Sequence, residues 1–307
     1  MRQLLRLRIQ KAKGLGMITP QVVADFAMLH METDDGLPIA PAAHHWLWLR
    51  LICDVAIRRL LIVATPESAK TTWMLAYAAF HVGFFPEQPV IVAAVSGPVA
   101  EKRSIALRNI VESVAFRETF PTVRPAAGMP WTTTEWSVSE EGRPHAGRLH
   151  PTVSAYGTGG SVTGSRAQLV IADDILDYDN SRTAHQRNVV DTWFHAALLS
   201  RVMARTGRAI VIGNAYHHDD TIARLRRSEA WVTCYIPLLT AGAAAGTSAG
   251  AGDRVSGGTG NDAGAGIVIS GTSTGITGTA RCGRAAGFGL SEAPCPFVPA
   301  PSRMSSK

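Results

Sequence analysis

Residues 60–72 read LLIVATPESAKTT, and this stretch decides the fold. An apolar, β-favouring run comes first, a turn at Pro66 follows, and Lys70 and Thr71 then open the apolar segment 73–80, which is long enough for a buried helix. A strand, a loop, a Lys-Thr pair and a helix in this order form the layout of a phosphate-binding P-loop. The N–H groups of such a loop and of the helix N-terminus carry partial positive charge and attract phosphate.

The pattern therefore predicts a nucleotide site. Lys70 is expected to contact the β- and γ-phosphates, and Thr71 to offer its hydroxyl to Mg²⁺. The residues expected to bind the nucleotide are Ser68, Ala69, Lys70, Thr71 and Thr72.

The loop departs from the usual pattern G-x-x-x-x-G-K-[ST], because Ala64 and Ala69 stand where both glycines are expected. Glycine permits a positive φ and a close approach of the backbone. Alanine at position 69 can still cradle a phosphate if its φ stays negative. An ordinary strand–turn–helix with a solvated Lys70 explains this stretch alone equally well.

A second motif favours the nucleotide interpretation. The mostly apolar run 168–172 follows a glycine-rich loop and ends in Asp173 and Asp174. Burying two acids at a strand end is costly unless they have a role. In P-loop enzymes the first acid belongs to the Mg²⁺ shell, and the second orients and deprotonates the attacking water. A pair of helix N-caps is the alternative.

The remaining segments predict an α/β fold, a parallel β-sheet flanked by helices as in P-loop NTPases. Strands are expected near residues 89–96 and 208–213, with an amphipathic helix over 101–116 between them. Asn214 follows the later strand, in the position of a γ-phosphate sensor one strand over from Asp173. Residues 217–220, His-His-Asp-Asp, are expected to form a loop and a helix N-terminus, because one short cluster is not a metal-ligand set.

Composition sets the domain boundaries. Residues 1–40 form a helical segment, residues 41–240 the P-loop ATPase domain, and residues 241–307 a low-complexity tail rich in Gly, Ala, Ser and Thr. Such a tail cannot bury enough apolar surface to offset the entropy of ordering, so we expect it to be disordered. The net charge of +6 permits an anionic partner such as DNA without requiring one. No apolar run is long enough to span a membrane.

Two smaller expectations concern single residues. Cys53 and Cys234 lie in apolar runs and are expected in the core, and no pair of cysteines has metal-type spacing. His44, His45 and Trp46, ahead of the first strand, are candidates for an adenine contact, while Trp48 is expected to be a core residue.

Four segments together resemble the large subunit of tailed-bacteriophage terminases, the DNA-packaging motors. They are ATPESAKTT (64–72), VTGSR (162–166), LVIADD (169–174) and IGNAYHHDD (212–220). The resemblance covers roughly residues 40–240 and is specific as a set, although each motif is weak alone. This family often has a non-standard P-loop in which the glycine before the lysine is replaced.

The resemblance implies a Mg²⁺-dependent ATPase that assembles as a ring at the capsid portal and drives double-stranded DNA into a procapsid in the host cytoplasm. Further implied partners are the portal protein and the small terminase subunit, with no membrane involved. By position, Lys70 and Thr71 bind phosphate and Mg²⁺, and Asp173 binds the metal. The implied catalytic residues are Asp174, where many relatives have Glu, Asn214, in the coupling motif, and Arg166. Arg166 would stabilise charge in cis or in a neighbouring subunit; a surface arginine paired with a phosphate or carboxylate is the alternative.

One departure from the family concerns the nuclease. Full-length large subunits add a nuclease domain with a carboxylate cluster around two metals. Residues 241–307 hold only three scattered acids, so we expect no nuclease activity from this chain. Two alternatives stay open: a helicase-like ATPase, for whose second ATPase domain the chain has no room, and a truncated or degenerate prophage remnant that binds partners without turnover.

Overall fold

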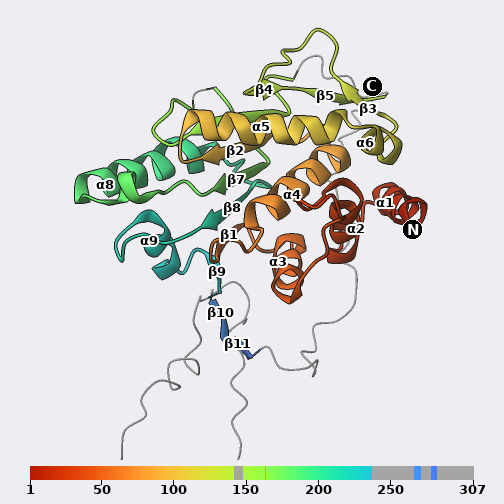
Figure 1. The fold of residues 1–307 in the computed structure, drawn as a ribbon. Helices are drawn as coiled ribbons and strands as arrows, with labels where there is room; N and C mark the ends of the chain where they lie inside the picture. Colours follow the sequence, from red (N-terminus) through yellow and green to blue (C-terminus); the bar gives the residue numbers. More distant parts are fainter. Residues whose placement is uncertain (142–147, 163, 237–265, 271–277, 282–307) are drawn as a thin grey trace, which may run out of the picture.

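The computed structural model describes residues 1–141, 148–162 and 164–236, and the backbone of residues 266–270 and 278–281. Its centre is a nine-stranded sheet flanked by helices (Figure 1). The order is β11-β10-β9-β1-β8-β7-β2-β6-β4, in which the six strands from β9 to β6 are parallel. The strands are β1 (Arg59–Val63), β2 (Val90–Ala94), β4 (Glu135–Trp136), β6 (Val153–Gly157), β7 (Leu169–Asp173), β8 (Arg208–Gly213), β9 (Val232–Tyr235), β10 (Gly266–Ser270) and β11 (Gly278–Arg281).

This arrangement confirms the predicted α/β fold with a parallel sheet between helices. A separate two-stranded sheet pairs β3 (Val123–Pro125) with β5 (Val138–Glu140). The helices are α1 (Arg2–Leu15), α2 (Pro20–His30), α3 (Ala43–Cys53), α4 (Lys70–Phe84), α5 (Gly97–Glu112), α6 (Val114–Thr119), α7 (Tyr178–Ser181), α8 (Ala184–Thr192), continued by a π-helical turn at Trp193–Leu198, and α9 (Thr221–Arg227). In the described ranges no helix is long and apolar enough to cross a membrane.

The central strands are apolar on both faces because each face has its own core. Along β1, Leu60 and Ile62 belong to the core under α2, α3, α4 and α5, whereas Leu61 and Val63 belong to the core under α8 and α9. Alternating side chains of a strand point to opposite faces, so a strand covered on both sides must be continuously apolar. Because β1, β8 and β7 are parallel neighbours, their carboxyl ends lie at one edge of the sheet.

The N-terminal segment 1–40 packs onto the same core as α4. Ile9 of α1 and Phe26 of α2 are fully buried there, and the Phe26 ring meets the Phe80 ring of α4 at a centroid distance of 5.7 Å. Thr19 caps α2 by accepting a hydrogen bond from the N–H of Val22, and Pro20 supplies a preset first turn. The helix expected over 101–116 is interrupted at Ser113, which ends α5 and caps α6.

Core positions expected from the sequence are confirmed. Cys53 and Cys234 are buried free thiols, and Trp48 is 1% exposed. Most of the tail 241–307 lies outside the described residues. The segments described within it are β10 and β11, a hairpin that extends the sheet antiparallel to β9. No strand was expected there from composition, although Gly266–Ser270 contains the β-branched run Ile-Val-Ile.

The buried histidine His81 should make the stability of the folded chain sensitive to acid. Burial, reinforced by Arg208, lowers the pKa of His81 on α4 from 6.5 to about 3. The unfolded chain therefore takes up a proton near pH 6.5 that the folded chain refuses, so this contribution to stability is complete above pH 6.5 and is lost as the pH falls toward 3. Between pH 7.5 and pH 5 the unfolding free energy of the wild type should fall by roughly 2 kcal/mol more than that of His81→Leu.

Urea unfolding at the two pH values measures this difference. His185→Leu, at an exposed position of α8, controls for the loss of a histidine. An equal drop in unfolding free energy for the wild type and His81→Leu would show that His81 is not the acid-sensitive group.

Candidate functional site

The loop 64–69 connects the end of β1 to the start of α4 and is held at three points. The N–H of Ala64 donates to the carbonyl of Gly213 at the end of β8, at 3.3 Å. Within the loop, the Ser68 hydroxyl donates to the Thr65 carbonyl at 2.7 Å. From α3, the His45 Nε2 lies 2.9 Å from the Ser68 carbonyl, while its Nδ1 accepts the N–H of Ala42. The loop is therefore closed on itself and anchored to the end of β8 and to α3.

The backbone of this loop is left-handed at two positions before Lys70. Ala69 has φ +56°, not a negative value, and Glu67 has φ +62°. Both residues lie in the turn that leads from β1 into α4. A side chain in this conformation costs about 1–2 kcal/mol. The loop thus keeps the shape that glycine usually provides.

Restoring glycine at that position should stabilise the protein. In Ala69→Gly the relief of left-handed strain exceeds the entropy that glycine adds to the unfolded chain, which leaves a net gain of roughly 0.5–1 kcal/mol. Ala64→Gly is the matched control, because Ala64 is buried and is not among the left-handed residues. It should lower stability. Urea unfolding of both variants measures the difference, and a loss in Ala69→Gly equal to that in Ala64→Gly would contradict the strained loop.

Asp173, the last residue of β7, has both carboxylate oxygens occupied. Its Oδ1 accepts the hydroxyl of Thr71 at 3.1 Å, and its Oδ2 lies 3.0 Å from the Nε of Arg103. The side chain is only 3% exposed. Burial raises the pKa of Asp173, an effect that Arg103 opposes and neighbouring Asp174 reinforces. The predicted partnership of Thr71 with Asp173 is therefore present, across 102 residues of sequence.

Arg103 is the site residue that sequence reasoning missed. It lies on α5, the helix that follows β2, and reaches the carboxyl end of the adjacent strand β7. In the sequence it stands among Glu101, Lys102 and Ser104, a pattern typical of a solvated helix face. The contact between Arg103 and Asp173 depends on how α5 lies relative to the end of β7, and the sequence around Arg103 does not show this.

Asp174 has an unusual backbone and an incompletely bonded side chain. Its φ is +50°, and its N–H donates to the carbonyl of Ile212 at 2.9 Å. The Nζ of Lys70 lies 3.6 Å from Oδ2. Burial raises the pKa of Asp174, and Lys70 is the main opposing charge. Oδ1 is buried and accepts no well-formed hydrogen bond from the described residues.

Asn214 lies beside this carboxylate. It directly follows β8, whose residue Ile212 pairs with Asp173 of β7, so it is one strand over from the acidic pair as expected. Its backbone N–H is among the groups that oppose the rise in the pKa of Asp174. Gly213 leaves room for the acid, since a Cβ at that position would lie 3.2 Å from the Asp174 Oδ1.

These side chains fit a hard divalent cation beside phosphate. The Thr71 hydroxyl and the carboxylates of Asp173 and Asp174 are the oxygen donors that Mg²⁺ prefers, and the unpartnered Oδ1 of Asp174 is an available acceptor. Lys70 and Arg103 balance the two carboxylates. The arrangement can therefore hold an anion at the α4 N-terminus and a cation against the acidic pair.

Other predicted residues lie around this centre or outside it. Ser68 and Thr72 are partly buried on either side of Lys70, in the loop and in the first turn of α4. Arg166, ahead of β7, is exposed, and no hydrogen bond or ion pair joins it to the described residues. The structure therefore does not bring Arg166 to the acidic pair.

The segment 217–220 forms a loop and a helix N-terminus as expected. Asp220 caps α9 by accepting the N–H of Ala223 at 2.8 Å, and it also accepts the N–H groups of Tyr216 and His217. Asp219 pairs with Arg224 at 2.8 Å. Across the described ranges, no three His, Cys, Asp or Glu side chains converge as metal ligands.

Sequence comparison supports the resemblance that the motifs indicated. No protein-family model matches the chain. Over 182 residues the chain is 25% identical to the large terminase subunit of Enterobacteria phage T3, which covers 59% of this chain and 30% of that protein. The chain thus spans less than a third of the length of this relative. It is similar to part of a phage terminase large subunit.

Two solved structures show weaker similarity to the chain. One is the large terminase of bacteriophage HK97, with a TM-score of 0.48 and 16% identity over 67% of this chain and 40% of that chain. The other is a point mutant of the large terminase ATPase domain of Thermus phage P74-26, with a TM-score of 0.41 and 14% identity over 57% of this chain and 66% of that chain.

Proposed function

We propose that this chain is the ATP-hydrolysing motor part of a viral terminase that packages double-stranded DNA into a procapsid. The observation that carries the proposal is the convergence of Lys70, Thr71, Asp173 and Asp174 at the carboxyl ends of β1 and β7. These residues come from two sequence motifs about a hundred residues apart, and their functional groups match phosphate and Mg²⁺. The similarity to a terminase large subunit supports the assignment to packaging.

Each residue has a separate part in ATP hydrolysis. Lys70 and the N–H groups of Ser68, Ala69 and Thr72 hold the phosphates, and Thr71 with Asp173 holds Mg²⁺. The contribution of Mg²⁺ when bound is to neutralise negative charge on the phosphate oxygens.

Asp174 orients the attacking water and accepts its proton. The water oxygen bonds to the γ-phosphorus as the bond to the ADP oxygen breaks, which yields ADP and inorganic phosphate. The raised pKa of Asp174 brings this carboxylate closer to the range of a useful base at neutral pH. Asn214, beside Asp174, senses the γ-phosphate.

Arg166 acts on a neighbouring copy of the chain. Its exposure and lack of a partner among the described residues suit an arginine that completes the site across a ring interface. The ring works with double-stranded DNA, the portal protein and the small terminase subunit in the host cytoplasm. We assign no nuclease activity to this chain.

Mg²⁺-dependent ATP hydrolysis by the purified full chain tests the proposal. Phosphate release should require Mg²⁺ and should rise when double-stranded DNA is added, because a packaging motor couples turnover to its substrate. Hydrolysis that is equal with Mg²⁺ and with excess chelator would contradict the assigned site. If hydrolysis requires Mg²⁺ but its rate is unchanged by DNA at both low and high salt, the chain is an ATPase and the packaging role is contradicted.

A further inference from the structure

The guanidinium of Arg103 is held at the acidic pair by one hydrogen bond. Its Nε donates to the Oδ2 of Asp173 at 3.0 Å, and among the described residues no other hydrogen bond from this guanidinium is formed. The Arg103 side chain is 29% exposed, although the carboxylate that it contacts is buried. A single-point contact lacks the second parallel hydrogen bond that makes bidentate pairs of arginine and carboxylate strong. Arg103 can therefore leave Asp173 by breaking one contact.

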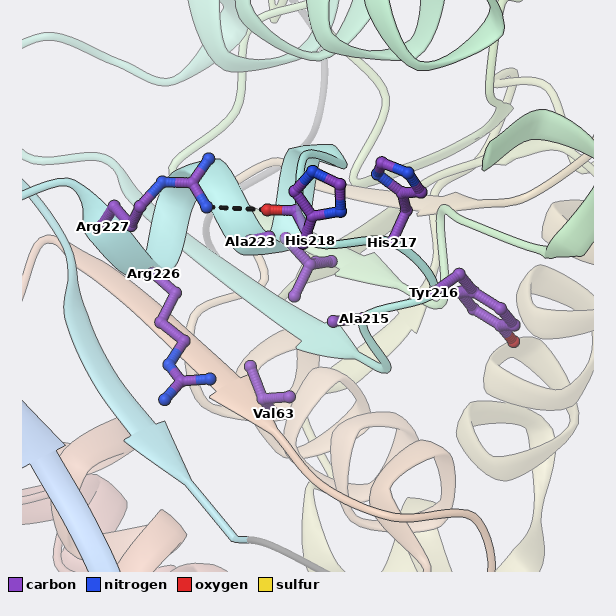
Figure 2. A pocket seen from close by; sticks show the side chains of 9 residues that line it. Val63, Ala215, Tyr216, His217, His218, Ala223, Arg226 and Arg227 are labelled. Carbon is purple, nitrogen blue, oxygen red and sulfur yellow. Dashed lines mark hydrogen bonds between the residues drawn. The ribbon is translucent and has the colours of Figure 1, made fainter. Parts of the chain in front are cut away.

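Other arginines of the chain are fixed by several acceptors. Arg208 donates to three backbone carbonyls at and after the end of α3, at 2.6, 2.8 and 3.0 Å. Arg227 donates to the carbonyl of His218, the hydrogen bond that Figure 2 shows, and it also pairs with Asp219. These arginines fasten segments of the fold to each other, whereas the guanidinium of Arg103 is bonded to the site alone.

Arg103 also lies on the buried side of α5, where an apolar residue is the usual choice. Ala100 and Leu107, one turn before and one turn after it, are fully buried. Behind it, apolar side chains of α4, β2 and β7 enclose a cavity of only about 10 Å³, which leaves no space for the guanidinium to move inward. A charge on this stripe is unfavourable unless it is compensated, and Asp173 is the compensating group.

The carboxylate that compensates Arg103 is the one that fits a metal ion. Each oxygen of Asp173 already has a donor, the hydroxyl of Thr71 at Oδ1 and Arg103 at Oδ2. Arg103 thus supplies the positive charge that this buried carboxylate needs when no metal is bound. A divalent cation against the same carboxylate would repel the guanidinium at short range, in a site that holds little water. Arg103 and Mg²⁺ are therefore alternatives at Asp173.

We propose that Arg103 is a resident counter-ion of Asp173 that gives way to Mg²⁺ only when the nucleotide binds. The proposal rests on the proposed function and adds a control on its metal site. Without nucleotide, Arg103 competes with Mg²⁺ for the carboxylate, so the metal binds weakly. With nucleotide, the phosphates at Lys70 supply further oxygen ligands for the metal, and Arg103 is displaced. The chain then loads metal and nucleotide together, and the empty site keeps its buried carboxylate neutralised.

Calorimetric titration of the full chain with magnesium chloride, in the absence of nucleotide, tests the competition. Arg103→Met keeps a long apolar stem but removes the charge, so it should bind Mg²⁺ roughly tenfold more tightly than the wild type. Arg103→Lys keeps the charge and should stay close to the wild type. Adding Asp173→Ala to Arg103→Met should abolish the gain. Arg205→Ala, at an exposed position before β8, is the matched arginine control and should not change the affinity.

Thermal unfolding separates this competition from a role in packing. Without metal, Arg103→Met leaves Asp173 buried and unpaired, so its Tm should lie below that of the wild type. Magnesium chloride should raise the Tm of this variant more than that of the wild type, because the variant binds the ion more tightly. A lower Tm together with a Mg²⁺ affinity equal to or weaker than that of the wild type would make Arg103 a packing residue and overturn the proposal.

The wild type gives a test that does not require Arg103→Met to fold. In chain made with isotope-labelled arginine, the Nε–H of Arg103 should give an NMR signal protected from exchange, identified by its absence from Arg103→Lys. The signal should persist with the non-hydrolysable β,γ-imido analogue of ATP in excess chelator, and it should lose its protection when Mg²⁺ is added.

The other outcomes of this NMR experiment overturn the proposal. Loss of protection with the analogue in chelator would make the phosphate, and not the metal, the group that displaces Arg103. A signal unchanged in the complex saturated with Mg²⁺ and analogue would show that Arg103 and the metal share Asp173. Either result refutes the counter-ion role alone, because the nucleotide is bound. Wild-type chain that binds neither the analogue nor Mg²⁺ in calorimetry refutes the proposed function as well.

Discussion

Lys70→Ala should lower nucleotide affinity by about 10²–10³-fold and bring ATP hydrolysis to background. The Lys70 side chain is only 9% exposed, and its Nζ lies 3.6 Å from the Asp174 Oδ2, at the N-terminus of α4. A preorganised charge in a buried site acts on phosphate much more strongly than a solvated lysine does. Titration with ATP and a phosphate-release assay measure the two losses.

Lys102→Ala is the matched control for this variant. Lys102 is exposed on α5, one residue from Arg103, and should leave affinity and turnover unchanged. Thermal unfolding of both variants separates a local effect from loss of the fold. ATP binding by a folded Lys70→Ala protein within a few-fold of the wild type would place the phosphates elsewhere and contradict the site.

Asp174→Asn should lower the hydrolysis rate by about 10²–10⁴-fold while ATP affinity stays within a few-fold of the wild type. The amide keeps the size of the side chain but cannot accept the proton of the attacking water. Single-turnover hydrolysis under saturating ATP measures the chemical step apart from binding. Asp179→Asn, five residues along the chain at an exposed position of α7, should have no effect.

Binding and hydrolysis of ATP by the wild type and by Asp174→Asn also decide whether this chain is a motor or a remnant without turnover. ATP binding by the wild type with no hydrolysis, alone or with DNA, would favour the remnant. Wild-type hydrolysis that Asp174→Asn leaves intact would assign the proton-accepting role to another residue.

The position of the site could be predicted because its main residues follow apolar strands. Runs such as 60–63 and 169–172 identify buried parallel strands, and the carboxyl ends of parallel strands meet at one edge. Asn214 was expected one strand over from Asp173, and the pairing of β7 with β8 confirms this. Lys70, Thr71 and the two acids were therefore placed together correctly.

The features that sequence reasoning missed depend on geometry between elements. The ion pair between Arg103 and Asp173 requires α5 to pass the end of β7, a relation that no local pattern encodes. Ala69 has a positive φ although an alanine side chain disfavours it, so the turn into α4 overrides the preference of that residue.

Calorimetric titration of the full chain with ATP, in Mg²⁺ and in excess chelator, tests the central claim most directly. The claim is that Lys70, Thr71, Asp173 and Asp174 form one site for a Mg²⁺-nucleotide. We predict saturable binding of one ATP per chain that is tighter with Mg²⁺, and loss of the Mg²⁺ dependence in Asp173→Ala. No binding under either condition, or a Mg²⁺ dependence that survives in Asp173→Ala, would contradict it.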